Sequence, residues 1–92
     1  MKPIRHILLM DDDLDDCDIF TEALAEAARG IRLTCRQNPE EALEDIPSLE
    51  PDLIFLDINM PRKNGFECLK DLKSGEDSRH IPVVMYSNSG RP

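Results

Sequence analysis

Four aspartates lie at the ends of two apolar segments, where together they could hold a cation. The acidic residues 11–13 directly follow the apolar run 7–10, and Asp57 closes a second apolar run at 53–56. If the two runs are neighbouring parallel strands, their carboxyl ends meet and the carboxylates converge on one small volume. Like charges so close repel each other unless a cation binds or a proton is taken up. A hard divalent cation with oxygen ligands is the expected occupant.

The elements that must position these aspartates alternate between strands and helices along the whole chain. Short apolar or alternating segments predict strands at 5–10, 31–36, 53–57 and 81–86. Helical spacing and helix boundary residues predict helices at 13–29, from Pro39 to just before Pro47, and at 65–74. This alternation implies right-handed crossovers and an α/β fold with a doubly wound parallel sheet. Ligands bind such sheets outside the carboxyl ends of the strands.

Asp57 differs from the acidic residues that serve only to begin a helix. Acidic residues are common in first helical turns, and we expect Asp13, Asp15 and Asp16 to act only there. Asp57 instead ends an apolar strand, and the next helix is not expected until Gly65. Because carboxylates are seldom buried without a partner, Asp57 is the strongest functional candidate.

Length and charge restrict the class of protein. The 92 residues form one domain at most, and 11 basic against 19 acidic residues give a net charge of −8. This charge disfavours non-specific binding to nucleic acid or to an anionic membrane. No apolar run approaches the roughly 18 residues of a membrane-spanning helix, and the amino terminus lacks the pattern of a signal peptide. A cytoplasmic location is therefore expected.

The cysteines and histidines offer no second site in the sequence. Cys17, Cys35 and Cys68 are odd in number and share no metal-ligand spacing. Buried, reduced thiols are therefore favoured over a disulfide or a zinc site. His6 begins a strand and His80 follows a charged stretch, so both are expected to be surface residues without a catalytic role. In the helix at 65–74, spacing predicts that Phe66, with the leucines that follow it, faces the sheet.

Three segments in combination resemble the receiver domain of two-component response regulators. They are the pair Asp11-Asp12, the segment 56–61 followed by Gly65, and the segment 82–87. Each segment alone is weak, but all three occur in the family's order over the whole chain. Within the family, the run of acids, the segment 61–65 and the polar insert before the fourth strand are most similar to stand-alone receivers of the phytochrome-partner type. The resemblance implies a flavodoxin-like fold with strand order 2-1-3-4. It also implies that residues 1–92 form one receiver domain without the family's fifth strand and last helices.

The resemblance assigns the aspartates to phosphoryl transfer. Asp57 would be the phosphoacceptor and would take the phosphoryl group from a sensor histidine kinase or a histidine phosphotransfer protein. Asp12 and Asp57 would bind Mg²⁺ directly, Asp11 would act through water, and the backbone carbonyl of Asn59 would be a further ligand. Such a domain is a signalling protein and not an enzyme, beyond its own phosphorylation and dephosphorylation.

The resemblance also assigns residues around the aspartates. Ser87 matches the switch hydroxyl that binds a phosphoryl oxygen, and Asn88 follows it at the same strand end. Pro61 and Gly65 would shape the loop over the site.

The family pattern continues beyond this chain with a strand that ends in a phosphate-binding lysine. No residue here takes that place, and Lys63 and Lys70 are excluded because they belong to a loop and to the surface of a helix. Without a further strand, the segment 82–86 would be an open apolar edge, which favours pairing. Either the native protein is longer, which we favour, or a second copy covers the edge in a homodimer.

Two other functions remain open at the level of sequence. A hydrolase could use Asp57 as its nucleophile, but Asn59 stands where such enzymes carry a second acid and cannot transfer its proton. A receiver remnant could instead act as a binding or dimerisation module that relays no phosphate.

Overall fold

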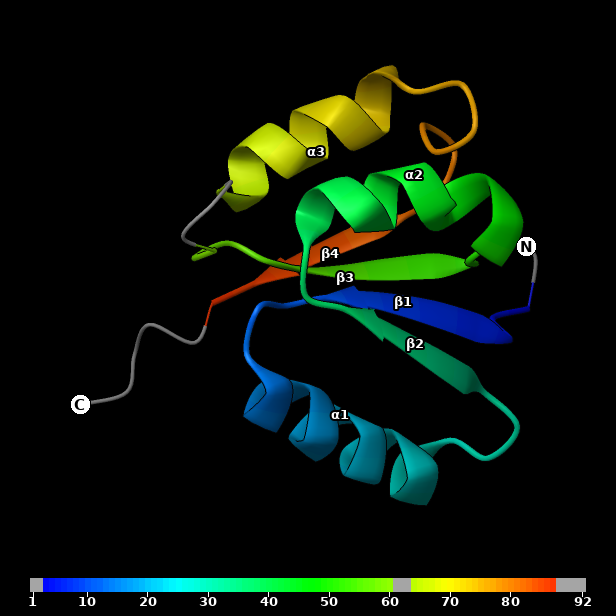
Figure 1. Cartoon of the computed structure of the whole chain (residues 1–92). Helices are drawn as coiled ribbons and strands as arrows, with labels where there is room; N and C mark the ends of the chain where they lie inside the picture. Colours follow the sequence, from blue (N-terminus) through cyan, green and yellow to red (C-terminus); the bar gives the residue numbers. More distant parts are fainter. Residues whose placement is uncertain (1–2, 61–63, 88–92) are drawn as a thin grey trace.

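The computed structural model of the chain describes residues 3–60 and 64–87. In this part, four parallel strands form one sheet in the order β2-β1-β3-β4 (Figure 1). The strands are β1 His6–Met10, β2 Arg32–Arg36, β3 Leu53–Asp57 and β4 Val83–Tyr86. The helices are α1 Leu14–Ala27, α2 Pro39–Leu49 and α3 Gly65–Ser74. The predicted α/β class and strand order 2-1-3-4 are confirmed.

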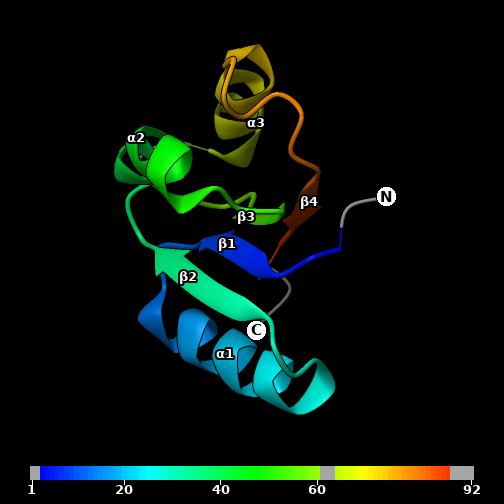
Figure 2. The same ribbon diagram turned by 90° about the vertical axis from the view of Figure 1, so that its right-hand side faces the viewer.

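The helices cover both faces of the sheet. Helix α1 lies on one face, and α2 and α3 lie on the other (Figure 2). Strand β1 is central and buried along its whole length, as its apolar sequence predicts. Leu8 and Met10 belong to the main apolar core with α2 and α3, while alternation directs Ile7 and Leu9 to the opposite face. Strand β1, directly before Asp11 and Asp12, is therefore the most deeply buried strand of the sheet.

Polar side chains begin each of the three helices. Asp13 accepts a hydrogen bond from the backbone N–H of Asp15 at the start of α1, and Asn38 and Asn64 cap α2 and α3 in the same way. The predicted end of α2 before Pro47 is wrong, because α2 continues to Leu49 with Pro47 inside its last turns. A proline so close to the carboxyl end removes one helical hydrogen bond, and the helix tolerates that loss.

Helix α3 packs against the core through Leu69 and Leu72, as predicted, but Phe66 takes no part in this contact. Gly65, Cys68 and Leu72 are buried, at the spacing of three and four residues that defines one side of a helix. Phe66 is 63% exposed, so its predicted contact with the sheet is wrong. Phe66 lies outside this row of buried positions. Gly65 and Cys68 in the row are small, and they let α3 approach the sheet closely.

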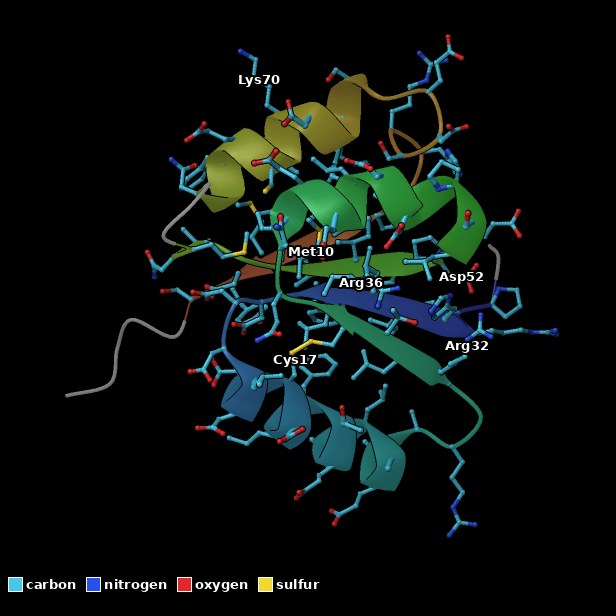
Figure 3. The ribbon with its side chains drawn as sticks, in the orientation of Figure 1. Met10, Cys17, Arg32, Arg36, Asp52 and Lys70 are labelled. Atoms are coloured by element: carbon cyan, nitrogen blue, oxygen red, sulfur yellow. A yellow bond between two sulfur atoms is a disulfide. The ribbon has the colours of Figure 1, made fainter. Side chains whose placement is uncertain are left out.

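Cys17 and Cys35 form a disulfide, which corrects the expectation of three reduced thiols (Figure 3). Cys17 is on the buried side of α1 and Cys35 is in β2, and their Cα atoms are 6.3 Å apart, within the usual range for a disulfide. The bond ties α1 to the edge of the sheet that it covers. Cys68 is a buried thiol in α3, as expected.

A hydrogen-bond network closes the amino end of the sheet around His6. The His6 ring contacts the backbone oxygen of Leu49 through Nδ1 at 2.9 Å and the hydroxyl of Thr34 through Nε2 at 2.7 Å. The Asp52 carboxylate accepts the backbone N–H groups of Arg5 and His6. His6 is only 4% exposed, so its prediction as a surface residue is wrong. Its strand, β1, lies between β2 and β3, and the close approach of these neighbouring strands buries the ring.

The exposure of His80 and the short length of the helices agree with the sequence. His80 is exposed in the connection between α3 and β4, as predicted. None of the helices described is long and apolar enough to cross a bilayer.

Candidate functional site

The carboxyl ends of β1 and β3 bring three aspartates together. Carboxylate oxygens of Asp11, Asp12 and Asp57 all lie within 4.8 Å of one another. The strands are in register up to Met10 opposite Leu56, so the residues that follow are direct neighbours. Asp11 is fully buried, Asp57 is 3% exposed and Asp12 is exposed. The predicted convergence of these carboxylates is present in the structure.

Backbone hydrogen bonds hold the two buried carboxylates in place. The N–H of Asp11 donates to the backbone oxygen of Arg36 at 3.1 Å, which continues the β1–β2 ladder by one residue. Asp11 Oδ1 accepts the N–H of Asp13 at 2.9 Å, so the turn into α1 orients it. Asp57 Oδ1 accepts the N–H of Asn59 at 3.0 Å. Each side chain is therefore oriented by the turn that follows its own strand.

The environment of Asp57 disfavours its negative charge. Burial raises the pKa of Asp57 most, and the nearby charges of Asp11, Asp12 and Asp16 raise it further. The hydrogen bond from the Asn59 N–H acts in the opposite direction but does not cancel these effects. A cation bound at this site would therefore offset the repulsion between Asp57 and the neighbouring carboxylates.

Tyr86 also enters the site. It is the last residue of β4 and lies opposite Asp57 in the strand register. Its hydroxyl donates a hydrogen bond to Asp11 Oδ2. Burial, followed by this hydrogen bond and the Asp11 charge, raises the pKa of Tyr86, so the hydroxyl stays protonated and remains a donor. Sequence reasoning gave Tyr86 no role, and the available signal was its position at a strand end beside the acidic residues.

Ser87 and Asn59 meet above the aspartates. The side-chain amide of Asn59 donates to Ser87 Oγ at 2.7 Å and joins the loop after β3 to the end of β4. Both residues are exposed, so a ligand at the aspartates could reach them. Asn88, which follows Ser87, lies outside the described residues.

Gly65 lets the start of α3 approach the end of β3. Its N–H donates to the backbone oxygen of Ile58 at 2.9 Å. A Cβ atom at position 65 would lie 2.7 Å from the backbone oxygen of Asp57, which is too close for any side chain. The close approach at position 65 therefore requires glycine. Pro61, predicted to shape the loop with Gly65, lies outside the described residues.

Of the two lysines excluded as phosphate-binding residues, Lys63 and Lys70, the structure describes only Lys70. Lys70 is exposed on the outer side of α3 (Figure 3). Lys73 Nζ donates to the backbone oxygen of Ile81, close to the start of β4. Lys63 lies outside the described residues. That no lysine of this chain binds the phosphoryl group stays a prediction.

The donor atoms at the site suit a hard divalent cation. Asp11, Asp12 and Asp57 offer carboxylate oxygens only, the ligand type that Mg²⁺, Mn²⁺ and Ca²⁺ prefer. No nitrogen or sulfur ligand belongs to the group, which disfavours zinc and copper. The predicted roles of individual ligands, including the backbone carbonyl of Asn59, stay predictions.

The chain matches one protein family over nearly its full length. The model of the family described as response regulator receiver domain matches residues 7–92. Among curated relatives, Response regulator Rcp1 of Synechocystis sp. is 31% identical, over 96% of this chain and 65% of the relative. Polar-differentiation response regulator DivK of Brucella anthropi is 31% identical, over 87% of this chain and 63% of the relative. The chain thus spans about two-thirds of these relatives.

Some relatives are much longer proteins. A probable cyclic di-GMP phosphodiesterase of Vibrio cholerae is 30% identical over 94% of this chain, but the match covers only 19% of that protein. The activity in its name therefore says nothing about the segment that it shares with this chain.

Solved structures show the same arrangement. The phosphorylated cyanobacterial phytochrome response regulator RcpA superimposes with a TM-score of 0.81 at 31% identity, over 97% of this chain and 69% of that chain. The Mn²⁺-bound form of response regulator Rcp1 gives a TM-score of 0.79 at 30% identity, over 95% of this chain and 68% of that one.

Proposed function

Because the chain belongs to the family of response regulator receiver domains, we propose that it receives a phosphoryl group on Asp57 in two-component signalling. The observation that carries this proposal is the convergence of Asp11, Asp12 and Asp57 within 4.8 Å at one end of the sheet. Asp57 is the member of this group that ends β3 and has the loop of Asn59 beside it. We further propose that residues 1–92 act as one receiver domain.

The reaction is the transfer of a phosphoryl group from a phosphohistidine of a partner kinase or phosphotransfer protein. A carboxylate oxygen of Asp57 forms a new bond to phosphorus, and the bond from phosphorus to the histidine nitrogen breaks. The electron pair of that bond stays on the histidine, and Asp57 becomes an acyl phosphate. Charge repulsion is the main obstacle, because the incoming phosphoryl group and the clustered carboxylates of Asp11, Asp12 and Asp57 are all anionic.

Mg²⁺ is the proposed cofactor, and when bound it would neutralise negative charge on the carboxylates and the phosphoryl oxygens. We assign direct ligation to Asp12 and Asp57, contact through water to Asp11, and a further ligand position to the backbone carbonyl of Asn59. Asp12 is exposed beside two buried carboxylates, so a cation can enter from the Asp12 side. This exposure supports the proposed assignment of ligand roles. Mg²⁺ needs only one or two protein carboxylates and keeps several waters.

Ser87 is the proposed hydroxyl that responds to phosphorylation, with Asn88 beside it. The contact between Ser87 Oγ and the Asn59 side chain supports this role, because it brings the hydroxyl to the loop that follows the phosphoacceptor. A phosphoryl group on Asp57 adds strong acceptor oxygens, toward which a nearby hydroxyl can be drawn. Pro61 and Gly65 are the proposed residues that shape the loop.

The proposal is tested by incubating the protein with a small phosphodonor, acetyl phosphate, in the presence of Mg²⁺. The expected product is a base-labile adduct of one phosphoryl group, seen by intact mass. Asp57→Asn abolishes the adduct, because an amide cannot form the acyl phosphate. Asp77→Asn is the matched control, since it removes an exposed carboxylate elsewhere and keeps the adduct.

Other outcomes would point to other functions. An adduct that persists in Asp57→Asn contradicts the assignment of the phosphoacceptor. Steady release of phosphate indicates a hydrolase, although Asn59 offers no second acid for that chemistry. Neither adduct nor turnover indicates a binding module.

A further inference from the structure

Tyr86 reaches across the sheet to the deepest carboxylate of the site. It ends β4, on the far side of β3 from the strand that carries Asp11. Its hydroxyl nevertheless donates to Asp11 Oδ2, between residues 75 positions apart in the chain. Tyr86 therefore joins the ends of β1 and β4 directly, past the phosphoacceptor on β3.

Two neutral donors hold the two oxygens of the Asp11 carboxylate. The backbone N–H of Asp13 donates to Oδ1, and the Tyr86 hydroxyl donates to Oδ2. Asp11 is fully buried, so water does not compensate its charge as it would at the surface. The pair of donors fixes the plane of the carboxylate and stabilises its charge without adding a positive charge of its own.

We propose that Tyr86 is a positioning residue of the metal site, which acts on a bound divalent cation through Asp11. This inference rests on the proposed function, because it presumes that the aspartates bind Mg²⁺. Groups that hydrogen-bond to metal ligands orient them, and their loss commonly weakens metal binding by about 10–100-fold. Tyr86 forms such a hydrogen bond to Asp11, and it directly precedes Ser87, the proposed switch residue.

The connection through Tyr86 also gives the end of β4 a direct contact with the metal site. Any shift of Asp11 on metal binding must be followed by the Tyr86 hydroxyl or must break its hydrogen bond. The phenol environment therefore changes with occupancy of the site. A hydrogen bond with only a structural role would leave that environment unchanged when the metal binds.

The first test compares metal affinity in two variants that each lose one hydrogen-bonded hydroxyl. Tyr86→Phe keeps the ring and removes the donor to Asp11. Ser78→Ala removes a buried hydroxyl that donates to the backbone oxygen of Leu72 at 2.6 Å, outside the acidic site. In Mg²⁺ titrations by calorimetry, we expect Tyr86→Phe to bind about tenfold more weakly than the parent protein and Ser78→Ala to bind equally well.

The second test needs no variant at position 86. Tyr86 is the only tyrosine of the chain, which contains no tryptophan, so tyrosine absorption and emission report on this phenol alone. We expect both to change on addition of Mg²⁺, with the same midpoint as calorimetric binding. Asp11→Asn should change the tyrosine signal already in the absence of metal.

The outcomes separate this inference from the function on which it rests. If the parent protein binds no Mg²⁺, or if Asp12→Asn binds as well as the parent, the proposed metal site is wrong. If Asp12→Asn loses binding while Tyr86→Phe retains full affinity, the role of Tyr86 is overturned. A tyrosine signal that does not respond to bound metal overturns it as well.

Discussion

The two ends of strand β1 each bury a polar side chain, but they satisfy it in different ways. At the amino end, both ring nitrogens of His6 have hydrogen-bond partners, and Asp52 accepts two backbone N–H groups. At the carboxyl end, Asp11 and Asp57 are buried beside Asp12, and all three would carry the same charge. Hydrogen bonds from neutral donors orient Asp11 and Asp57 there.

The difference separates a structural end from a reactive end. Buried polar groups that are fully paired hold strands in register and contribute to stability. Groups whose charges repel each other lower stability, and a fold retains them where binding or chemistry benefits. Contacts at the amino end therefore fix β1 between β2 and the end of α2. The carboxyl end offers the clustered carboxylates of the proposed cation site.

The largest effect is expected for the exposed member of the acidic site. Loss of a group that only orients a metal ligand costs about 10–100-fold in affinity. Asp12→Asn removes the carboxylate proposed as a direct ligand, so it should cost at least about 100-fold. Calorimetric Mg²⁺ titration measures this. Asp52→Asn at the amino end is the control, and it should leave the affinity unchanged. Equal losses in both variants would break the distinction between the two ends.

Metal should stabilise the folded protein, because it binds the assembled site and not the unfolded chain. At a Mg²⁺ concentration of 100 times Kd, the expected gain is about 2.7 kcal/mol in the free energy of unfolding. Urea unfolding with and without Mg²⁺ measures it. Asp57→Asn should be more stable than the parent without metal and should gain less when metal is added. A similar gain in both proteins would mean that the stabilising ions bind elsewhere.

The amino end should affect stability alone. His6→Ala removes the ring that contacts Leu49 and Thr34, and we expect a loss of about 2 kcal/mol in the free energy of unfolding. Urea unfolding measures this loss. Affinity for Mg²⁺, measured under folded conditions, should stay that of the parent protein. A large change in affinity would show that the two ends are coupled through β1.

A smaller effect concerns pH in the absence of metal. The pKa of Asp57 is raised in the folded state above its ordinary value of 3.8, so the folded protein binds this proton more tightly than the unfolded chain does. The contribution of Asp57 to stability is therefore present at low pH and is lost as the pH rises through the raised pKa. Asp57→Asn removes this contribution.

The measurement is urea unfolding in a chelator between neutral pH and 3.8. The difference in stability between the parent protein and Asp57→Asn should shrink as the pH falls. A constant difference would contradict the raised pKa.

The sequence predicted the features that depend on one segment at a time. Apolar runs predicted the buried strands, and the position of Asp57 at the end of such a run predicted its place in the site. Alternation of strands and helices predicted a parallel, doubly wound sheet, and the resemblance to receiver domains supplied the strand order 2-1-3-4. Together these were enough to bring Asp11 and Asp57 to the same edge.

The features that sequence reasoning missed depend on contacts between distant segments. The disulfide joins Cys17 to Cys35 because α1 packs over β2, which residue spacing does not show. The contact of Tyr86 with Asp11 likewise spans the sheet. Burial of His6 depends on how closely two neighbouring strands approach it. Each of these required knowing which elements face each other, and periodicity gives only the face of one element.

One measurement compares the two ends of the sheet directly, and it is a titration with Mg²⁺ followed by amide NMR. Each backbone N–H reports on its own surroundings. We expect shifts concentrated at residues 11–13, 57–59 and 86–87, with little change at residues 5–6, 32–34 and 49–52. Shifts centred on the amino end, or spread evenly over the sheet, would contradict the claim that the carboxyl end is the metal and phosphoacceptor site.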